Sequence, residues 1–312
     1  MLSSVATLGT VQLARNAAPA VRLPRSPARA AMLEGLRRRN AVLDGLFYDI
    51  SVVDESEAVA IAPWLAAEGA VLIVPPSGAG KLTLCPSAED FVAHGGEAVH
   101  ALAIAGVGSS ALGSAAFARN VADAVGRPVA AVVSGYGLAD LLTEALGGYF
   151  WFGALNGIRH MFEGLDRLAE AASGSGERTV ADAGDHLLRG SRDTKTVLAL
   201  LSDPRLSFDL LTGHSKGNLV LAEALYELAE RNRERARAIA NRARIVTVSA
   251  VIAMPPVFSD VTDIIGAWDW FGGLNSRRDI DADVIVPKAW HHTNTELTAH
   301  LPVTETLANV LT

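Results

Sequence analysis

The sequence has little cysteine, no excess of basic residues and no long hydrophobic run. Its single cysteine, Cys85, cannot form an internal disulfide or a cysteine-based zinc site, so we expect a protein of the reducing cytoplasm. Lys and Arg number 27 against 34 Asp and Glu, a net charge of −7, which argues against a dedicated nucleic-acid binder. No apolar stretch reaches the roughly 18 uninterrupted residues of a membrane-spanning helix, and we expect a soluble chain.

The residues that are present indicate a globular chain. Its 312 residues are 50% apolar and 20% charged, which is enough apolar material for a sizeable core. The first 33 residues carry four arginines and no acidic residue. Such a segment fits either an organelle-targeting peptide or a poorly ordered N-terminal arm, and we favour the arm. Residues 34–312 are expected to form one domain.

Short apolar runs alternate with helical patterns along most of the chain. The expected strands are residues 69–74, 99–105, 129–134, 207–212, 244–253, 262–268 and those around 284–286, and the clearest helices are 114–125 and 218–240. This alternation predicts an α/β fold with a mostly parallel sheet flanked by helices. Residues 138–200 are mostly helical in pattern, and we expect them to form an inserted helical cap. Its aromatic residues 149–152 would either pack on the sheet or line an acyl pocket.

The segment Gly213-His214-Ser215-Lys216-Gly217 is a G-x-S-x-G motif between an apolar strand and a helix. A nucleophile on a sharp strand-to-helix turn needs small residues two positions before and after it, because strand, helix and side chain are crowded there. Ser215 is therefore the candidate nucleophile, and the N–H of Lys216 is a candidate oxyanion donor. His214 is expected only to fill the turn. The alternative is a tight turn in which Ser215 merely caps the helix.

A serine nucleophile needs a histidine base and an acid that orients the base, and in this architecture they follow in the order Ser, Asp or Glu, His. Asp269 follows an apolar run and is the candidate acid, with a loop-capping carboxylate as the alternative. Three histidines, His291, His292 and His300, follow the last expected strand. Strand-end spacing favours the first two as the base.

Two glycine-rich segments follow expected strands. In residues 106–110 the backbone N–H groups near Val107 and Gly108 are candidates for the second oxyanion donor, with a plain tight turn as the alternative. Residues 77–83 resemble a phosphate-binding loop, but Pro75 and Leu82 stand where that motif needs glycine and a hydroxyl residue. We therefore expect no bound nucleotide, no metal and no other cofactor.

Together these segments resemble the α/β-hydrolase superfamily from about residue 96 to the C-terminus. The Gly-His-Ser-Lys-Gly box is similar to the box of the fungal triacylglycerol lipases and their lipase-like bacterial relatives. The segment Ala299-His300-Leu301 resembles the segment that carries the base in those lipases. The resemblance implies a serine hydrolase that cleaves carboxylic esters through an acyl-enzyme. Together with the strand-end spacing, it leads us to expect His300 or His292 as the base and His291 as a bystander.

The partners that follow from this interpretation are a small-molecule or lipid ester, and a lipid surface touched transiently by the cap. The same fold also occurs in proteins that do no chemistry. A non-catalytic α/β-hydrolase-like binding or scaffold protein is therefore the alternative function.

Overall fold

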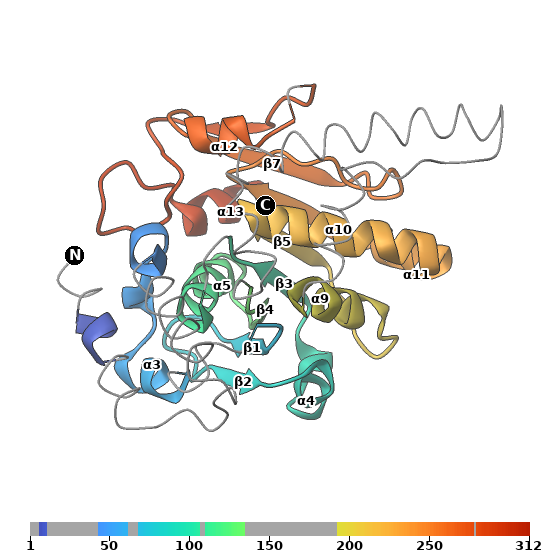
Figure 1. The fold of residues 1–312 in the computed structure, drawn as a ribbon, viewed down its shortest axis with the longest axis horizontal. Helices are drawn as coiled ribbons and strands as arrows, with labels where there is room; N and C mark the ends of the chain where they lie inside the picture. The colour runs from blue at the N-terminus through green and yellow to red at the C-terminus, as the bar shows by residue number, and fades with distance from the viewer. Residues whose placement is uncertain (1–5, 11–42, 62–67, 107–109, 135–191, 278) are drawn as a thin grey trace, which may run out of the picture.

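The computed structural model describes residues 6–10, 43–61, 68–106, 110–134, 192–277 and 279–312 (Figure 1). Apart from residues 6–10, the expected N-terminal arm lies outside this part of the chain. The same holds for the expected cap, apart from its last residues. Within the described ranges no helix is long and apolar enough to cross a bilayer.

The centre of the fold is an eight-stranded mixed sheet with the strand order β2-β1-β4-β3-β5-β6-β7-β8. Strand β1 is antiparallel to both β2 and β4, and all other neighbours are parallel. The strands are β1 Val71–Val74, β2 Thr83–Cys85, β3 Ala101–Ile104, β4 Val129–Val132, β5 Leu210–His214, β6 Arg244–Val248, β7 Val261–Gly266 and β8 Val284–Val286. The expected mostly parallel α/β sheet is confirmed, and the short edge strand β2 had not been predicted.

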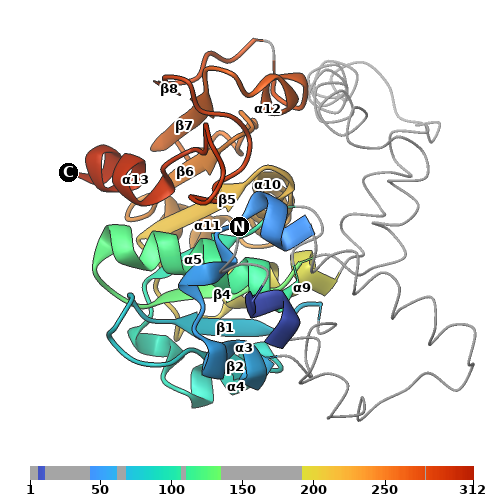
Figure 2. The ribbon, with the colours of Figure 1, turned by 90° about the vertical axis from the view of Figure 1, so that its left-hand side faces the viewer.

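Helices cover both faces of the sheet. They are α3 Glu55–Ile61, α4 Ala88–Ala93, α5 Ala111–Val125, α9 Arg192–Ser202, α10 Lys216–Arg231, α11 Arg233–Ala240, α12 Trp270–Leu274 and α13 Val303–Leu311, with short 3-10 turns at Ile50–Val52 and Gly96–Ala98. Figure 2 shows α5 and α13 on one side of the sheet and α9 and α10 on the other.

The fully buried strands explain why the central apolar runs are nearly continuous. Alternate residues of β3 face opposite cores, so that Ala101 and Ala103 pack under α5 while Leu102 and Ile104 pack under α10. A parallel strand covered by helices on both faces can be apolar throughout, as β3 and β4 are. Strand β5 is equally buried but ends in the polar Thr212 and His214, next to the site.

Some expected boundaries differ from the observed ones. The strand expected over 244–253 ends at Val248. The helix predicted over 218–240 is broken at Asn232, whose side chain accepts a hydrogen bond from the N–H of Arg235 and so begins α11. Helix α9 includes the last residues of the segment expected as a cap, and it packs against α10 and β4 through its apolar face, which includes Val197 and Leu201. This helix belongs to the body of the domain.

The chain changes direction across the sheet between β3 and β5. From β3 it passes through α5 to β4 on one side, and β5 and β6 then continue on the other side of β3. The carboxyl ends of β3 and β5 therefore meet where the connecting helices diverge to opposite faces. Open α/β sheets bind their ligands at such a point. Gly106 and Ser215 follow these two strand ends.

Candidate active site

Ser215 occupies a strained turn between β5 and α10. Its backbone angles are φ 53° and ψ −120°, in the region that side-chain-bearing residues rarely adopt, at a cost of about 1–3 kcal/mol. The turn is held from both ends: the N–H of Ser215 donates to the carbonyl of Val248 at 2.8 Å, and the N–H of Asn218 donates to the carbonyl of Ser215 at 3.1 Å. The side chain of Asn218 also donates to the carbonyls of Val248 and Ala250. Such strain gathers at functional sites because the surrounding structure has to maintain it.

Both glycines of the motif are required by close packing. A Cβ on Gly213 would lie 2.7 Å from the backbone nitrogen of Asn218. A Cβ on Gly217 would overlap the carbonyl oxygen of Ile104, at the end of β3, and lie 2.8 Å from the carbonyl oxygen of Ala105. The crowding inferred from the sequence is confirmed: the start of α10 causes it at Gly213, and the end of β3 causes it at Gly217.

Asp269 follows β7 and begins α12. One carboxylate oxygen accepts a hydrogen bond from the N–H of Gly272 at 2.6 Å, and a Cβ on Gly272 would lie 2.5 Å from the other oxygen. The same carboxylate lies 3.0 Å, through either oxygen, from Nδ1 of His291. Asp269 is therefore both a capping carboxylate and the partner of a histidine, which the sequence had presented as alternatives.

His291 completes a hydrogen-bonded chain to Ser215. Its Nε2 lies 3.0 Å from Oγ of Ser215, and Ser215, Asp269 and His291 are all buried. Because a carboxylate can only accept a hydrogen bond, the ring proton is on Nδ1 and forms a hydrogen bond to Asp269. Nε2 is then free to accept a hydrogen bond from the serine hydroxyl. This arrangement brings a base to the serine hydroxyl, and the carboxylate of Asp269, on the other side of the ring, fixes the orientation of that base.

The structure brings neither of the expected bases, His292 and His300, to Ser215, and places His291 there instead. The ring of His292 packs edge-on against Trp290 with centroids 5.6 Å apart, and burial lowers its pKa. His300 bonds through Nδ1 to the carbonyl of Leu297 at 3.1 Å. Neighbouring side chains in a non-helical segment point to different sides, so only one of His291 and His292 can face the serine.

Sequence reasoning also missed the rings that surround His291. Phe271 contacts it edge-on with centroids 4.8 Å apart, and Phe47 does so at 5.8 Å. Phe271 lies two residues after Asp269, and this closeness in the sequence could have pointed to its contact with the site. Nothing in the sequence pointed to Phe47, because it is far from the motif along the chain. Together the two rings limit the rotation of the imidazole and exclude water from it.

The expected oxyanion donors are described only in part. Val107 and Gly108 lie outside the described residues. The residue before them, Gly106, is beside the serine, because a Cβ added to it would lie 3.1 Å from Cβ of Ser215. Lys216 is the first residue of α10, where backbone N–H groups point out of the amino end of a helix. Its side chain is buried, which lowers its pKa to about 8, although the charge of Glu68 acts the other way.

His214 fills the turn as expected and is completely enclosed. Burial is the main reason that its pKa falls to about 3, and the nearby His291 lowers it further. The ring is therefore neutral at pH values well above 3.

The neutral His214 predicts a loss of stability in weak acid. Unfolded histidine titrates near pH 6.5 and folded His214 near pH 3, so between these values only the unfolded chain binds the proton. The stabilisation is complete above pH 6.5 and is lost as the pH falls, by up to about 1.4 kcal/mol per pH unit. Urea-unfolding midpoints at pH 7 and pH 5 measure this loss. The variant His214→Gln cannot titrate and should lose less over the same interval; equal losses would contradict the assignment.

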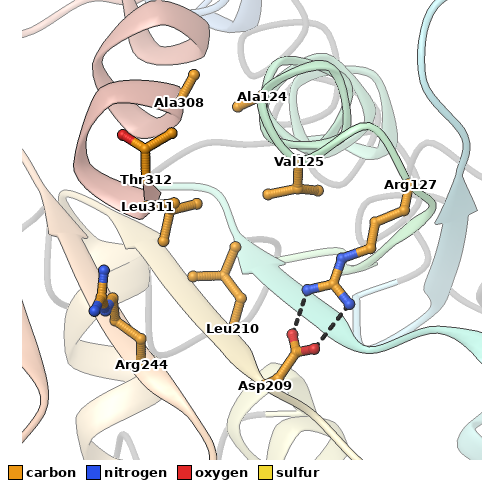
Figure 3. Close-up of a pocket in the computed structure, with 9 residues that line it drawn as sticks. All are labelled: Ala124, Val125, Arg127, Asp209, Leu210, Arg244, Ala308, Leu311 and Thr312. Atoms are coloured by element: carbon orange, nitrogen blue, oxygen red, sulfur yellow. Dashed lines mark hydrogen bonds and ion pairs between the residues drawn. The ribbon is translucent and has the colours of Figure 1, made fainter.

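A separate pocket of about 410 Å³ lies at the amino ends of the central strands (Figure 3). Its lining includes the first residues of β5 and β6, Leu210 and Arg244, whereas Ser215 follows the carboxyl end of β5. Its charges are already matched: Arg127 pairs with Asp209, and Arg244 pairs with Asp260 at 3.2 Å. The pocket does not contribute to the site at Ser215. No group of three or more side chains suited to a metal ion occurs among the residues that the structure describes.

Comparison of the chain with protein-family models, with curated proteins and with solved structures finds no match. The fold and site define an α/β protein with a buried Ser-His-Asp chain at the topological switch point of its sheet. The functional argument therefore depends on the geometry of this site.

Proposed function

We propose that the protein is a serine hydrolase that cleaves carboxylic esters through an acyl-enzyme. The observation that carries the proposal is the chain from Ser215 through His291 to Asp269, with both nitrogens of one imidazole used at 3.0 Å. A buried imidazole seldom links a strained serine to a carboxylate for structural reasons alone, because a plain turn needs neither partner.

The geometry supports a two-step reaction. Oγ of Ser215 attacks the ester carbonyl carbon while its proton passes to Nε2 of His291, and the Nδ1–H bond to Asp269 stabilises the imidazolium that forms. His291 then gives the proton to the leaving alkoxide oxygen, so that the alcohol departs and the acyl group remains on Ser215. In the second step the same nitrogen takes a proton from water, whose oxygen attacks the acyl carbon. His291 then returns this proton to Oγ of Ser215 as the acyl–Oγ bond breaks, which releases the acid and restores the serine hydroxyl.

The oxyanion that forms in each step needs hydrogen-bond donors. Within the proposal these are the N–H of Lys216 and the N–H groups near Val107 and Gly108. The position of Gly106 beside Ser215 supports a role for the loop after β3, because donors in that loop would face the carbonyl oxygen of a bound ester.

The proposal also covers the class of substrate, which we infer to be esters of apolar acyl groups. Trp268 and Trp270 lie on either side of Asp269 in the chain and are 56% and 61% exposed. Exposed aromatic residues next to a catalytic acid favour an apolar substrate, in keeping with the resemblance to lipases. The helical cap, which would cover such a substrate and touch a lipid surface, belongs to the same proposal.

Labelling with a fluorophosphonate probe tests the function directly. We expect the wild type to be labelled and Ser215→Ala to give no signal, because the probe reacts only with an activated serine. Ser249→Ala is the matched control, since Ser249 is also buried and has a positive φ of 58° but follows β6. It should label normally. p-Nitrophenyl esters of increasing chain length then define the acyl preference.

A wild type that neither reacts with the probe nor hydrolyses any ester of the series would overturn the proposal. The non-catalytic binding or scaffold protein would then be the better interpretation.

A further inference from the structure

The segment before α3 lies between the two loops that border the candidate active site. The hydroxyl of Tyr48 accepts a hydrogen bond from the N–H of Gly106, at 2.6 Å, and lies 2.9 Å from Nδ1 of His214. On its far side, Nε2 of His214 lies 3.0 Å from the carbonyl oxygen of His291. Tyr48 and His214 are both buried, with about 1% of their surface exposed. One hydroxyl thus connects the loop after β3 with the main chain of the histidine.

The protons in this network can be arranged in only one favourable way. The carbonyl oxygen of His291 can only accept, so Nε2 of His214 must donate. Because the ring is neutral, its Nδ1 then has no proton and accepts from the hydroxyl of Tyr48. That leaves the lone pairs of the hydroxyl for the N–H of Gly106, and each close contact has one donor and one acceptor.

Other contacts attach the same segment to both loops. The N–H of Thr293 donates to the carbonyl of Phe47 at 2.7 Å, two residues beyond His291. At the other loop, the N–H of Ser110 donates to the carboxyl group of Asp44 at 3.0 Å. The segment therefore holds the base loop and the loop that would supply the oxyanion donors relative to each other.

We propose that Tyr48 is a positioning residue of the site: by donating to Nδ1 of His214 and accepting from the N–H of Gly106, its hydroxyl fixes the His214 ring, and through that ring the place of the His291 main chain, together with the start of the loop after β3. The inference rests on the proposed function only for its kinetic consequence. The tautomer of His214 is a property of the folded chain and can be measured in an inactive protein.

Removal of the hydroxyl should disturb both sides of the site. In Tyr48→Phe, Nδ1 of His214 loses its hydrogen-bond donor, and of the two hydrogen bonds to the ring only the one from Nε2–H to the carbonyl of His291 still orients it. The ring and the main chain that it contacts are then less firmly held. Gly106 loses its acceptor at the same time, and both losses occur in a buried environment, where an unmade hydrogen bond is costly.

The expected kinetic result is a fall in kcat of about tenfold to a hundredfold with KM changed less than threefold, because small displacements at a reacting centre affect the transition state more than binding. The substrate is p-nitrophenyl butyrate. Thr295→Val is the matched control, because the hydroxyl of Thr295 bonds to Asp49 and so joins the same two segments without reaching Ser215, His214 or His291. Its kcat should stay within about twofold of the wild type.

The ring nitrogens of 15N-histidine-labelled protein give a second readout that a merely structural role would not change. We expect His214 to carry its proton on Nε2 in the wild type and in Tyr48→Phe, and the resonance of its unprotonated Nδ1 to move in Tyr48→Phe because that nitrogen loses the hydrogen bond from the hydroxyl. An Nδ1–H form in the wild type, or an Nδ1 resonance that does not move in Tyr48→Phe, overturns the inference. So does full kcat in Tyr48→Phe when the wild type is active.

The two ideas fail separately. An unreactive wild type that still shows the Nε2–H form and a hydrogen-bonded Nδ1 removes the proposed function but keeps the positioning network. If Tyr48→Phe does not fold, the Nδ1 resonance of His214 in the wild type decides the question: a hydrogen-bonded nitrogen supports the inference, and a free one overturns it.

Discussion

Replacing His291 with alanine is expected to lower kcat on a p-nitrophenyl ester by about three to six orders of magnitude, as far as the loss of Ser215 lowers it. The reason is that Nε2 of His291 is the proton acceptor nearest to Oγ of Ser215, at 3.0 Å. A serine without its base is a weak nucleophile at neutral pH. Because the two residues act as one unit, the double variant Ser215→Ala/His291→Ala should be hardly slower than either single variant.

The neighbouring histidines are the controls for this prediction. His292→Ala and His300→Ala should each lower kcat by about tenfold or less, because their rings bond or pack away from the serine. Steady-state kinetics on the three variants, with circular dichroism to check folding, make the comparison. A small loss for His291→Ala and a large loss for either control would show that the base is not the residue that the structure places there.

Gly217→Ala is expected to destabilise the fold by about 3–5 kcal/mol or to prevent folding, as overpacking against fixed backbone does. The added Cβ would overlap the carbonyl oxygen of Ile104 and crowd that of Ala105. Both oxygens are held in place: Ile104 is paired with β4 on one side and β5 on the other, and the carbonyl of Ala105 accepts a hydrogen bond from the hydroxyl of Ser134. The start of α10 would have to move away from the sheet, and Ser215 with it. The midpoint of urea unfolding, or the yield of folded protein, measures the effect.

Gly273→Ala provides the matched control for the added methyl group. Gly273 lies in α12, and a Cβ on it would meet no atom within 4 Å. Alanine is favoured over glycine in a helix by up to about 1 kcal/mol, so this variant should be as stable as the wild type or slightly more so. A Gly217→Ala variant with a normal unfolding midpoint would show that the turn is less crowded than the structure indicates.

Local patterns were sufficient for the sheet and for two members of the site. The apolar runs of β3, β4 and β5 are buried on both faces, so their composition alone reveals a central strand. Ser215 was predictable because the sharp turn around it leaves no room for side chains at Gly213 and Gly217, so the turn produces a recognisable local motif. Asp269 was predictable because it follows the end of β7. Local patterns were less informative at the sheet edge, where β2 is only three residues long, and at Asn232, where a polar cap interrupts an otherwise helical pattern.

By itself the sequence determined the alternation of strands and helices, the sharp turn at Ser215 and the presence of an acid and several histidines in the right order. Those features depend on residues that are close together in the chain. Only the tertiary structure decided that His291 is the histidine that meets Ser215, because the choice depends on how the loop after β8 is directed. It alone brought Tyr48 to His214, across 166 residues of sequence. Contacts at such a separation follow from the packing of whole elements, and no local propensity records them.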